Sequence, residues 1–117
     1  MQKFQTLTED TSNGGCLQGY FTTTRREIEE VFGEPTVISD GWDKITVEWV
    51  IQFEDGTYAS IYDYKRYEEG TPKMDEIYEW HIGGKNFRAA ELVSDAMGVP
   101  IEEYEMSAPN FRKKIYG

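Results

Sequence analysis

The sequence predicts an α+β fold, in which an antiparallel β-sheet meander carries two helices packed on one face. Residues 44–53 alternate polar and apolar side chains with the period of a strand that buries one face. Residues 24–32 and 87–97 instead carry apolar residues at helical spacing. Strands surround the first helix and precede the second, an order typical of a two-layer domain. We expect one domain over residues 1–117, with 108–117 as a loose tail.

The segment before the central strand contains two predicted strands and a helix. Residues 3–7 are expected to form an edge strand and residues 17–22 a second strand, joined by a loop rich in Thr, Ser, Asn, Asp and Gly. Thr24 and Glu27 have the spacing of a capping box, in which each side chain bonds the free amide of the other residue. Gly33 follows the last apolar residue and is expected to end the helix.

A hairpin occupies the middle of the chain, and its turn decides which side chains are buried together. If Gly56 is left-handed after a type I turn, Phe53 faces Thr57. A two-residue Asp-Gly loop would instead place Trp49 opposite Tyr62. The first register is preferred because it gathers the apolar side chains on one face. That face carries Trp49, Ile51, Ala59 and Ile61, and the opposite face carries Glu48, Val50, Gln52, Tyr58, Tyr62 and Tyr64.

After the hairpin, residues 65–73 are expected to be a loop and residues 75–82 a strand that ends at the following Gly-Gly pair. Asn86 is placed to cap the helix over residues 87–97. Residues 100–105 are expected to add one more helical turn, because proline suits the first position of a helix.

The net charge of −10 narrows the classes of partner. Such a chain repels nucleic acid phosphates and anionic lipid, so it is expected to bind neither nucleic acid nor membrane. It favours a basic partner, although charge also maintains solubility by itself. The single cysteine, Cys16, excludes an intramolecular disulfide and suits a reducing compartment. With no secretory or membrane-spanning segment evident, we expect a cytoplasmic protein.

Four segments resemble a pattern found in an uncharacterised family of small acidic proteins of tailed bacteriophages and other mobile elements. They are F-G-E-P-T at residues 32–36, W-V-I-Q-F-E-D-G-T at 49–57, I-Y-D-Y-K at 61–65 and W-H-I-G-G at 80–84. The resemblance spans roughly residues 19–97 and implies phage biology, in which small acidic proteins often disable host defences. It implies no catalytic residues, and would place the protein in the host cell cytoplasm.

Patterns for catalysis or metal binding are weak. Cys16 and His81 would make a nucleophile and base, but no motif surrounds either residue, and ordinary strand positions are the simpler interpretation. The scattered carboxylates lack the spacing of a calcium loop, and glycosidase chemistry needs two that face each other. The sequence therefore predicts no enzyme, no cofactor and no metal site.

A Gly-Gly pair before the second helix suggests an anion site as an alternative. Gly83 and Gly84, with Lys85 and Arg88, would hold a phosphate at the helix N-terminus. The run G-G-K-N-F-R matches neither the P-loop nor the dinucleotide fingerprint, so a simple turn is the competing interpretation.

Acidic and tyrosine side chains cluster in the second half of the chain. If they share a sheet face, they form an acidic surface with aromatic anchors, which is typical of protein interfaces. The competing interpretation is a solvated face whose tyrosines are covered by the tail or by a second subunit. The predicted binding residues are Glu48, Tyr58, Tyr62, Asp63, Tyr64, Glu68, Glu69, Asp75, Glu76 and Glu79.

The leading hypothesis is a small acidic inhibitor without enzymatic activity, which binds a basic, nucleic-acid-handling host protein such as a nuclease or defence complex and so acts as a DNA mimic. An immunity protein for a nuclease toxin fits the same observations. The alternative from another class is a protein that sequesters a nucleotide or other small anion. A homodimer is a further candidate assembly, through an edge strand at residues 3–7 or 36–39.

Overall fold

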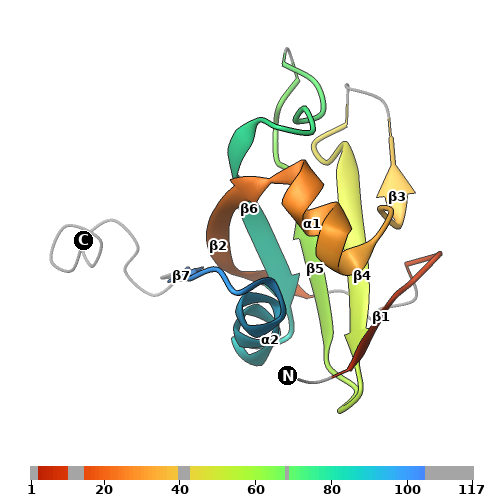
Figure 1. The fold of residues 1–117 in the computed structure, drawn as a ribbon, viewed down its shortest axis with the longest axis vertical. Helices are drawn as coiled ribbons and strands as arrows, with labels where there is room; N and C mark the ends of the chain where they lie inside the picture. Colours follow the sequence, from red (N-terminus) through yellow and green to blue (C-terminus); the bar gives the residue numbers. More distant parts are fainter. Residues whose placement is uncertain (1–2, 11–14, 40–42, 68, 105–117) are drawn as a thin grey trace, which may run out of the picture.

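An antiparallel sheet forms one layer of the molecule, and two helices cover one of its faces (Figure 1). The computed structural model describes residues 3–10, 15–39, 43–67 and 69–104. Within them the sheet has seven strands in the order β1-β4-β5-β6-β2-β7, with β3 also paired to β4. The predicted fold class is confirmed. The elements are β1 (Phe4–Thr6), β2 (Cys16–Thr24), α1 (Arg25–Phe32), β3 (Val37–Ile38), β4 (Val47–Phe53), β5 (Tyr58–Tyr62), β6 (Ile77–Gly84), α2 (Arg88–Met97) and β7 (Glu102–Glu103).

The central hairpin has the preferred register. Phe53 donates its amide to the carbonyl of Thr57 at 2.8 Å, and Gly56 has a φ of 89°. Trp49 therefore pairs with Ile61 rather than with Tyr62. The G1-type loop matches the twist of the two strands, and glycine takes the left-handed position without steric cost.

Strands β4, β5 and β6 follow one another as a meander, and β2 pairs along the far edge of β6. Two predictions about this half of the sheet are wrong. Gly83 and Gly84 continue β6 instead of ending it, because they pair with β2, and Gly83 also pairs with Ser60 of β5. Residues 100–104 form no helical turn, since β7 pairs with Gly19 and Tyr20 at the edge of β2, and residue 105 lies outside the described residues.

The helix ends agree with the sequence in part: Glu27 bonds the hydroxyl of Thr24 rather than its amide, and α2 begins at Arg88, one residue later than expected. The hydroxyl of Thr24 accepts the amide of Glu27 at 3.2 Å, and the amide of Gly33 donates back to Glu29 at the other end of α1. Before α2, the side chain of Asn86 accepts the amide of Arg88 at 3.0 Å. Among the described residues, no helix is both long and apolar enough to cross a membrane.

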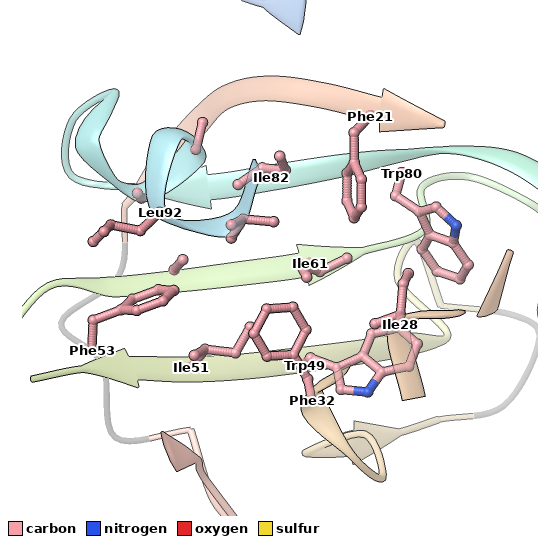
Figure 2. Packing of buried hydrophobic residues seen from close by; sticks show 14 of the residues in the cluster. Phe21, Ile28, Phe32, Trp49, Ile51, Phe53, Ile61, Trp80, Ile82 and Leu92 are labelled. Carbon is pink, nitrogen blue, oxygen red and sulfur yellow. The ribbon is translucent and has the colours of Figure 1, made fainter. Parts of the chain in front are cut away.

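Two tryptophans of the sheet fix the position of α1. Trp49 and Trp80 are fully buried, and their rings meet edge to face with centroids 5.5 Å apart (Figure 2). The indole of Trp49 donates to the carbonyl of Gly33 at 2.9 Å, and that of Trp80 donates to Thr23 at 3.1 Å. These carbonyls lie at opposite ends of α1. Each indole thus combines about 5 kcal/mol of apolar burial, as an upper bound, with a hydrogen bond that orients the helix.

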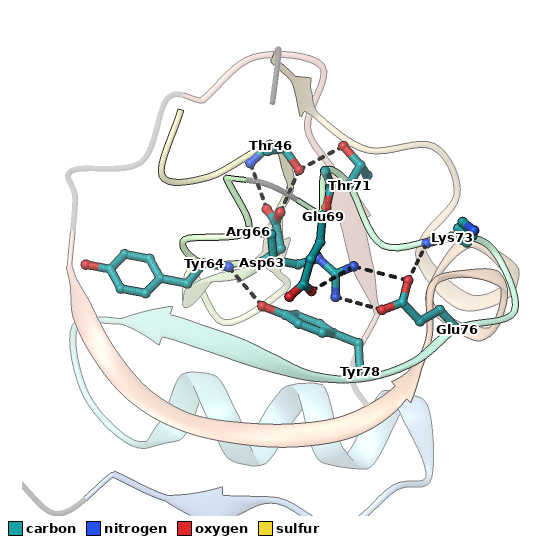
Figure 3. Close-up of polar contacts among 10 residues, drawn as sticks. Thr46, Asp63, Tyr64, Arg66, Glu69, Thr71, Lys73, Glu76 and Tyr78 are labelled. Atoms are coloured by element: carbon teal, nitrogen blue, oxygen red, sulfur yellow. Dashed lines mark hydrogen bonds and ion pairs between the residues drawn. The ribbon is translucent and has the colours of Figure 1, made fainter. Parts of the chain in front are cut away.

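A buried carboxylate joins the end of β5 to the start of β4. Asp63 is inaccessible to solvent and accepts three hydrogen bonds, from the amide and hydroxyl of Thr46 at 2.7 and 2.5 Å and from the amide of Val47 at 3.0 Å (Figure 3). Thr71 donates its own hydroxyl to Thr46 at 2.8 Å and ties in the following loop. Asp63 therefore does not belong to the predicted binding surface, because it is buried and its carboxylate bonds the chain itself.

We expect Asp63→Ala to lower the free energy of unfolding by about 3 kcal/mol or more, because it leaves two buried amides and a hydroxyl without a partner. Asp63→Asn keeps one acceptor oxygen for the amides and should cost less than half as much. Urea unfolding of the three proteins measures both values. Equal stability of Asp63→Ala and the natural protein would contradict this role.

Candidate functional site

The face of the sheet opposite the tryptophans carries the candidate site. Period-two alternation points one set of side chains away from α1 and α2, and no helix of the described residues covers them. We call this surface the outer face. Its residues come from four neighbouring strands and from Tyr64, the second residue after β5. They are Glu48 of β4, Tyr58, Ser60 and Tyr62 of β5, Glu79, His81 and Gly83 of β6, and Tyr20 of β2.

An aromatic cluster with His81 at its centre occupies the middle of the outer face. The His81 ring meets Tyr20 and Tyr62 edge to face, with centroids 5.0 and 5.4 Å away, and stacks on Tyr64 at 5.3 Å. Tyr104 extends the cluster beyond Tyr20 at 6.3 Å. Burial lowers the pKa of His81 below 6.5, so the ring is neutral at pH 7. A neutral His81 ring thus packs against three tyrosine rings at once.

Cys16 and His81, which were considered as a catalytic pair, contact different residues. Cys16 pairs with Gly84 along the sheet, whereas His81 pairs with Tyr20. The sulfur of Cys16 accepts a hydrogen bond from Gln18 at 3.4 Å, and His81 is enclosed by tyrosine rings. Neither contact orients a base toward a nucleophile. Among the described residues, no group of His, Cys, Asp and Glu is arranged to hold a metal ion.

A hollow of about 270 Å³ opens in the outer face beside the aromatic cluster. Gly83 keeps it open, because a Cβ at this position would lie 2.7 Å from Ser60 Oγ and 3.3 Å from Tyr62 Cε1. The lining residues are Asp10, Gly15, Cys16, Ile45, Glu48, Tyr58, Ala59, Ser60, Tyr62, Tyr64, Gly83 and Gly84. None of them is basic.

The carboxylate of Glu48 faces the hollow from a half-buried position. In the part of the chain that the structure describes, it has no hydrogen-bond or ion-pair partner. Burial raises the pKa of Glu48 from 4.5 to about 7, and the negative charge of Asp10 adds to the shift. Burial and the charge of Glu48 together raise the pKa of Tyr62 to about 12. Both raised pKa values indicate that the hollow disfavours negative charge on Glu48 and Tyr62.

Only half of the predicted binding residues lie together. Glu48, Tyr58, Tyr62, Tyr64 and Glu79 belong to the outer face. Asp63 is buried, and Glu68 lies outside the described residues. The remaining three acids are Glu69, Asp75 and Glu76, and each is paired with an arginine.

These ion pairs join the segment between β5 and β6 to itself and to α1. Arg66 contacts Glu76 at 2.7 Å and Glu69 at 3.5 Å, and its guanidinium lies 4.8 Å from the centre of the Tyr78 ring (Figure 3). Asp75 pairs with Arg26 at 2.7 Å. The arginine partners lower the pKa of both Asp75 and Glu76. These three acids therefore lie apart from the outer face, and each has an arginine partner within the chain.

The four residues of the predicted anion site do not converge. Gly83 and Gly84 are buried in β6, where a Cβ at Gly84 would meet Ala89 of α2 at 2.4 Å, so this glycine allows the helix to approach. Asn86 already accepts the amides of Arg88 and Ala89, at 3.0 and 3.2 Å. Lys85 is exposed, and Arg88 lies 3.5 Å from Asp55. The Gly-Gly pair therefore serves packing and the shape of the hollow.

No protein-family model, curated protein or solved structure matches this chain. Function is therefore inferred from the outer face itself. Tyr20, His81, Gly83 and Cys16 belong to this surface, although no pattern in the sequence groups them. They come from β2 and β6, which lie sixty residues apart in sequence and meet only through the sheet register.

We expect Glu48→Gln to stabilise the protein above pH 7. The folded protein binds the Glu48 proton more tightly than the unfolded chain, so the stability from this group is full below pH 4.5 and is lost as the pH rises to about 7. The gain over the natural protein should be on the order of 1 kcal/mol at about pH 8, allowing for solvent screening, and near zero at about pH 4.

Urea unfolding at both pH values measures this difference. Glu30→Gln, on the exposed side of α1, is the matched control for the charge change. An equal effect of the two substitutions at both pH values would show that Glu48 carries no uncompensated charge.

Proposed function

We propose that this protein is a non-enzymatic inhibitor that binds a basic, nucleic-acid-handling protein through its outer face. The observation that carries the proposal is the aromatic cluster on the face away from the helices, beside the Glu48 carboxylate, which has no partner among the described residues, on a chain of net charge −10. A host nuclease or defence protein of a phage-infected bacterium is the proposed target, in line with the sequence resemblance. An immunity protein for a nuclease toxin would use the same surface.

The aromatic rings supply the contact energy in this proposal. Tyrosine is enriched at interface hot spots because it brings a large area with few rotatable bonds. Tyr62 and Tyr64 are held by His81, and the amide of Tyr64 donates to the hydroxyl of Tyr78 at 3.1 Å. Rings that are fixed before binding lose less entropy on association.

The acidic side chains supply steering and selectivity. A groove that binds nucleic acid presents lysine and arginine to phosphates, and carboxylates such as Glu48 and Glu79 offer the same charge. The net negative charge raises the rate of encounter with a basic surface and repels the nucleic acid that competes for it. The anion alternative receives less support, since the described lining of the hollow includes two acids and three tyrosines but no basic residue.

The test is an affinity capture with tagged protein from a bacterial lysate, washed at about 0.05 M and then about 0.5 M salt. We expect basic nucleic-acid-binding proteins to be retained at low salt and released at high salt. Tyr64→Ala with Glu79→Gln, two exposed positions of the outer face, should reduce their recovery about tenfold, as loss of one interface anchor does.

A matched control with Glu30→Gln and Glu91→Gln removes charge from exposed positions on the helix layer and should retain full binding. The captured protein is then assayed for nuclease activity with and without the natural chain, and inhibition is expected. Retention that salt does not affect, or equal loss in both variants, would rule out the outer face as the binding surface.

A further inference from the structure

The hollow in the outer face can select a ligand more narrowly than a flat acidic surface can. Three tyrosines line it, and so does Glu48, whose carboxylate has no partner among the described residues. We propose that the hollow receives the cationic head of a single arginine or lysine side chain that the partner inserts between Glu48, Tyr58 and Tyr62. This inference rests on the proposed function and names the chemical group that the partner supplies.

The size of the hollow favours one side chain. Its volume of about 270 Å³ lies just below the roughly 300–1,000 Å³ of pockets that enclose a drug-sized ligand. Gly83 keeps this volume free, since any side chain at that position would occupy it and contact Ser60 and Tyr62. A guanidinium or ammonium group with part of its alkyl stem therefore fits within this volume.

The walls are suited to a cation. Tyrosine rings attract a cation over their faces, by about 0.5–2 kcal/mol depending on its desolvation. Within this chain the ammonium of Lys65 already lies 5.2 Å from the centre of the Tyr64 ring, so the same chemistry operates at the rim of the hollow. Tyr58 and Tyr62, deeper in the lining, have no such cation among the described contacts.

The charge of the hollow selects the sign of the ligand. Glu48 lies opposite Tyr62 in the sheet register, and Asp10 lines the same space. None of the described lining residues is basic, so an entering cation would meet the Glu48 carboxylate without competition from a positive side chain among them. The raised pKa values of Glu48 and Tyr62 are consistent with a cation site. Burial disfavours the negative form of each group, and a bound cation would stabilise that form.

Cys16 gives a direct chemical probe of the hollow, because it is the single cysteine, is exposed and lines this space. Two methanethiosulfonate reagents of similar size serve, one with a trimethylammonium and one with a sulfonate group. Each transfers its thioalkyl group to the Cys16 sulfur, forming a mixed disulfide and releasing methanesulfinate. The ratio of the cationic to the anionic rate, measured relative to the urea-unfolded chain, reports the local potential.

We expect this ratio to exceed that of the unfolded chain about tenfold and to fall at least threefold in Glu48→Gln. Glu30→Gln makes the same change in net charge on the helix layer and should leave the ratio unchanged. Unfolding measurements on the Glu48 variant confirm that it is folded. A ratio that falls equally in both variants would overturn the proposal, because net charge alone would then explain it.

Occupancy is tested by protection of Cys16 from a neutral thiol reagent. Acetyl-arginine amide should slow the modification, and acetyl-citrulline amide, which has nearly the same shape without the charge, should not. Putrescine represents a free amine. Protection by the arginine probe supports a side-chain receptor, and stronger protection by putrescine overturns it in favour of a small-molecule amine site. Absence of protection by all three probes also overturns it.

No partner enters either assay, so the two proposals fail separately. An outer face that captures a basic protein while the hollow shows no selectivity for cations refutes the receptor alone. Selective protection of Cys16 together with a capture that ignores the outer-face substitutions refutes the inhibitor and leaves the cation receptor standing.

Discussion

The edge-to-face contact between Trp49 and Trp80 decides which side of the sheet becomes the core. Both rings are fully buried, and both indole nitrogens donate to carbonyls at the ends of α1. An indole N–H without a partner would cost 1–3 kcal/mol in the interior, roughly, so these bonds restrict where the helix can lie. With the helices held on this face, the alternation of each strand leaves the tyrosines and Glu48 on the other.

Polar contacts at the margin of the outer face stabilise its geometry. Asp63 ties the end of β5 to the start of β4, and the residue that follows it, Tyr64, donates its amide to Tyr78 (Figure 3). Arg66 and its acidic partners then order the loop beyond. Asp63, which the sequence alone would assign to binding, thus helps to position Tyr64 on the outer face.

The two adjacent glycines of β6 show how one strand serves both layers. Gly84 faces the helices and lets Ala89 of α2 approach, whereas Gly83 faces outward and leaves room beside Tyr62. A residue with a Cβ at either position would close a space that the neighbouring layer uses. The pair therefore couples the packing of α2 to the hollow, although neither glycine has a side chain that could bind anything.

Most elements and their faces can be predicted from the sequence, because they depend on local chemistry: the period of β4, the caps of α1 and the left-handed Gly56 of the hairpin. The outer-face positions of Glu48, Tyr58 and Tyr62 followed from that register. The tertiary structure sets which acids are paired, since the partners of Asp75 and Asp63 lie 49 and 17 residues away. It also decided the surroundings of His81 and the pairing of β7 with β2, because contacts between distant strands are set by packing of the whole chain rather than by local pattern.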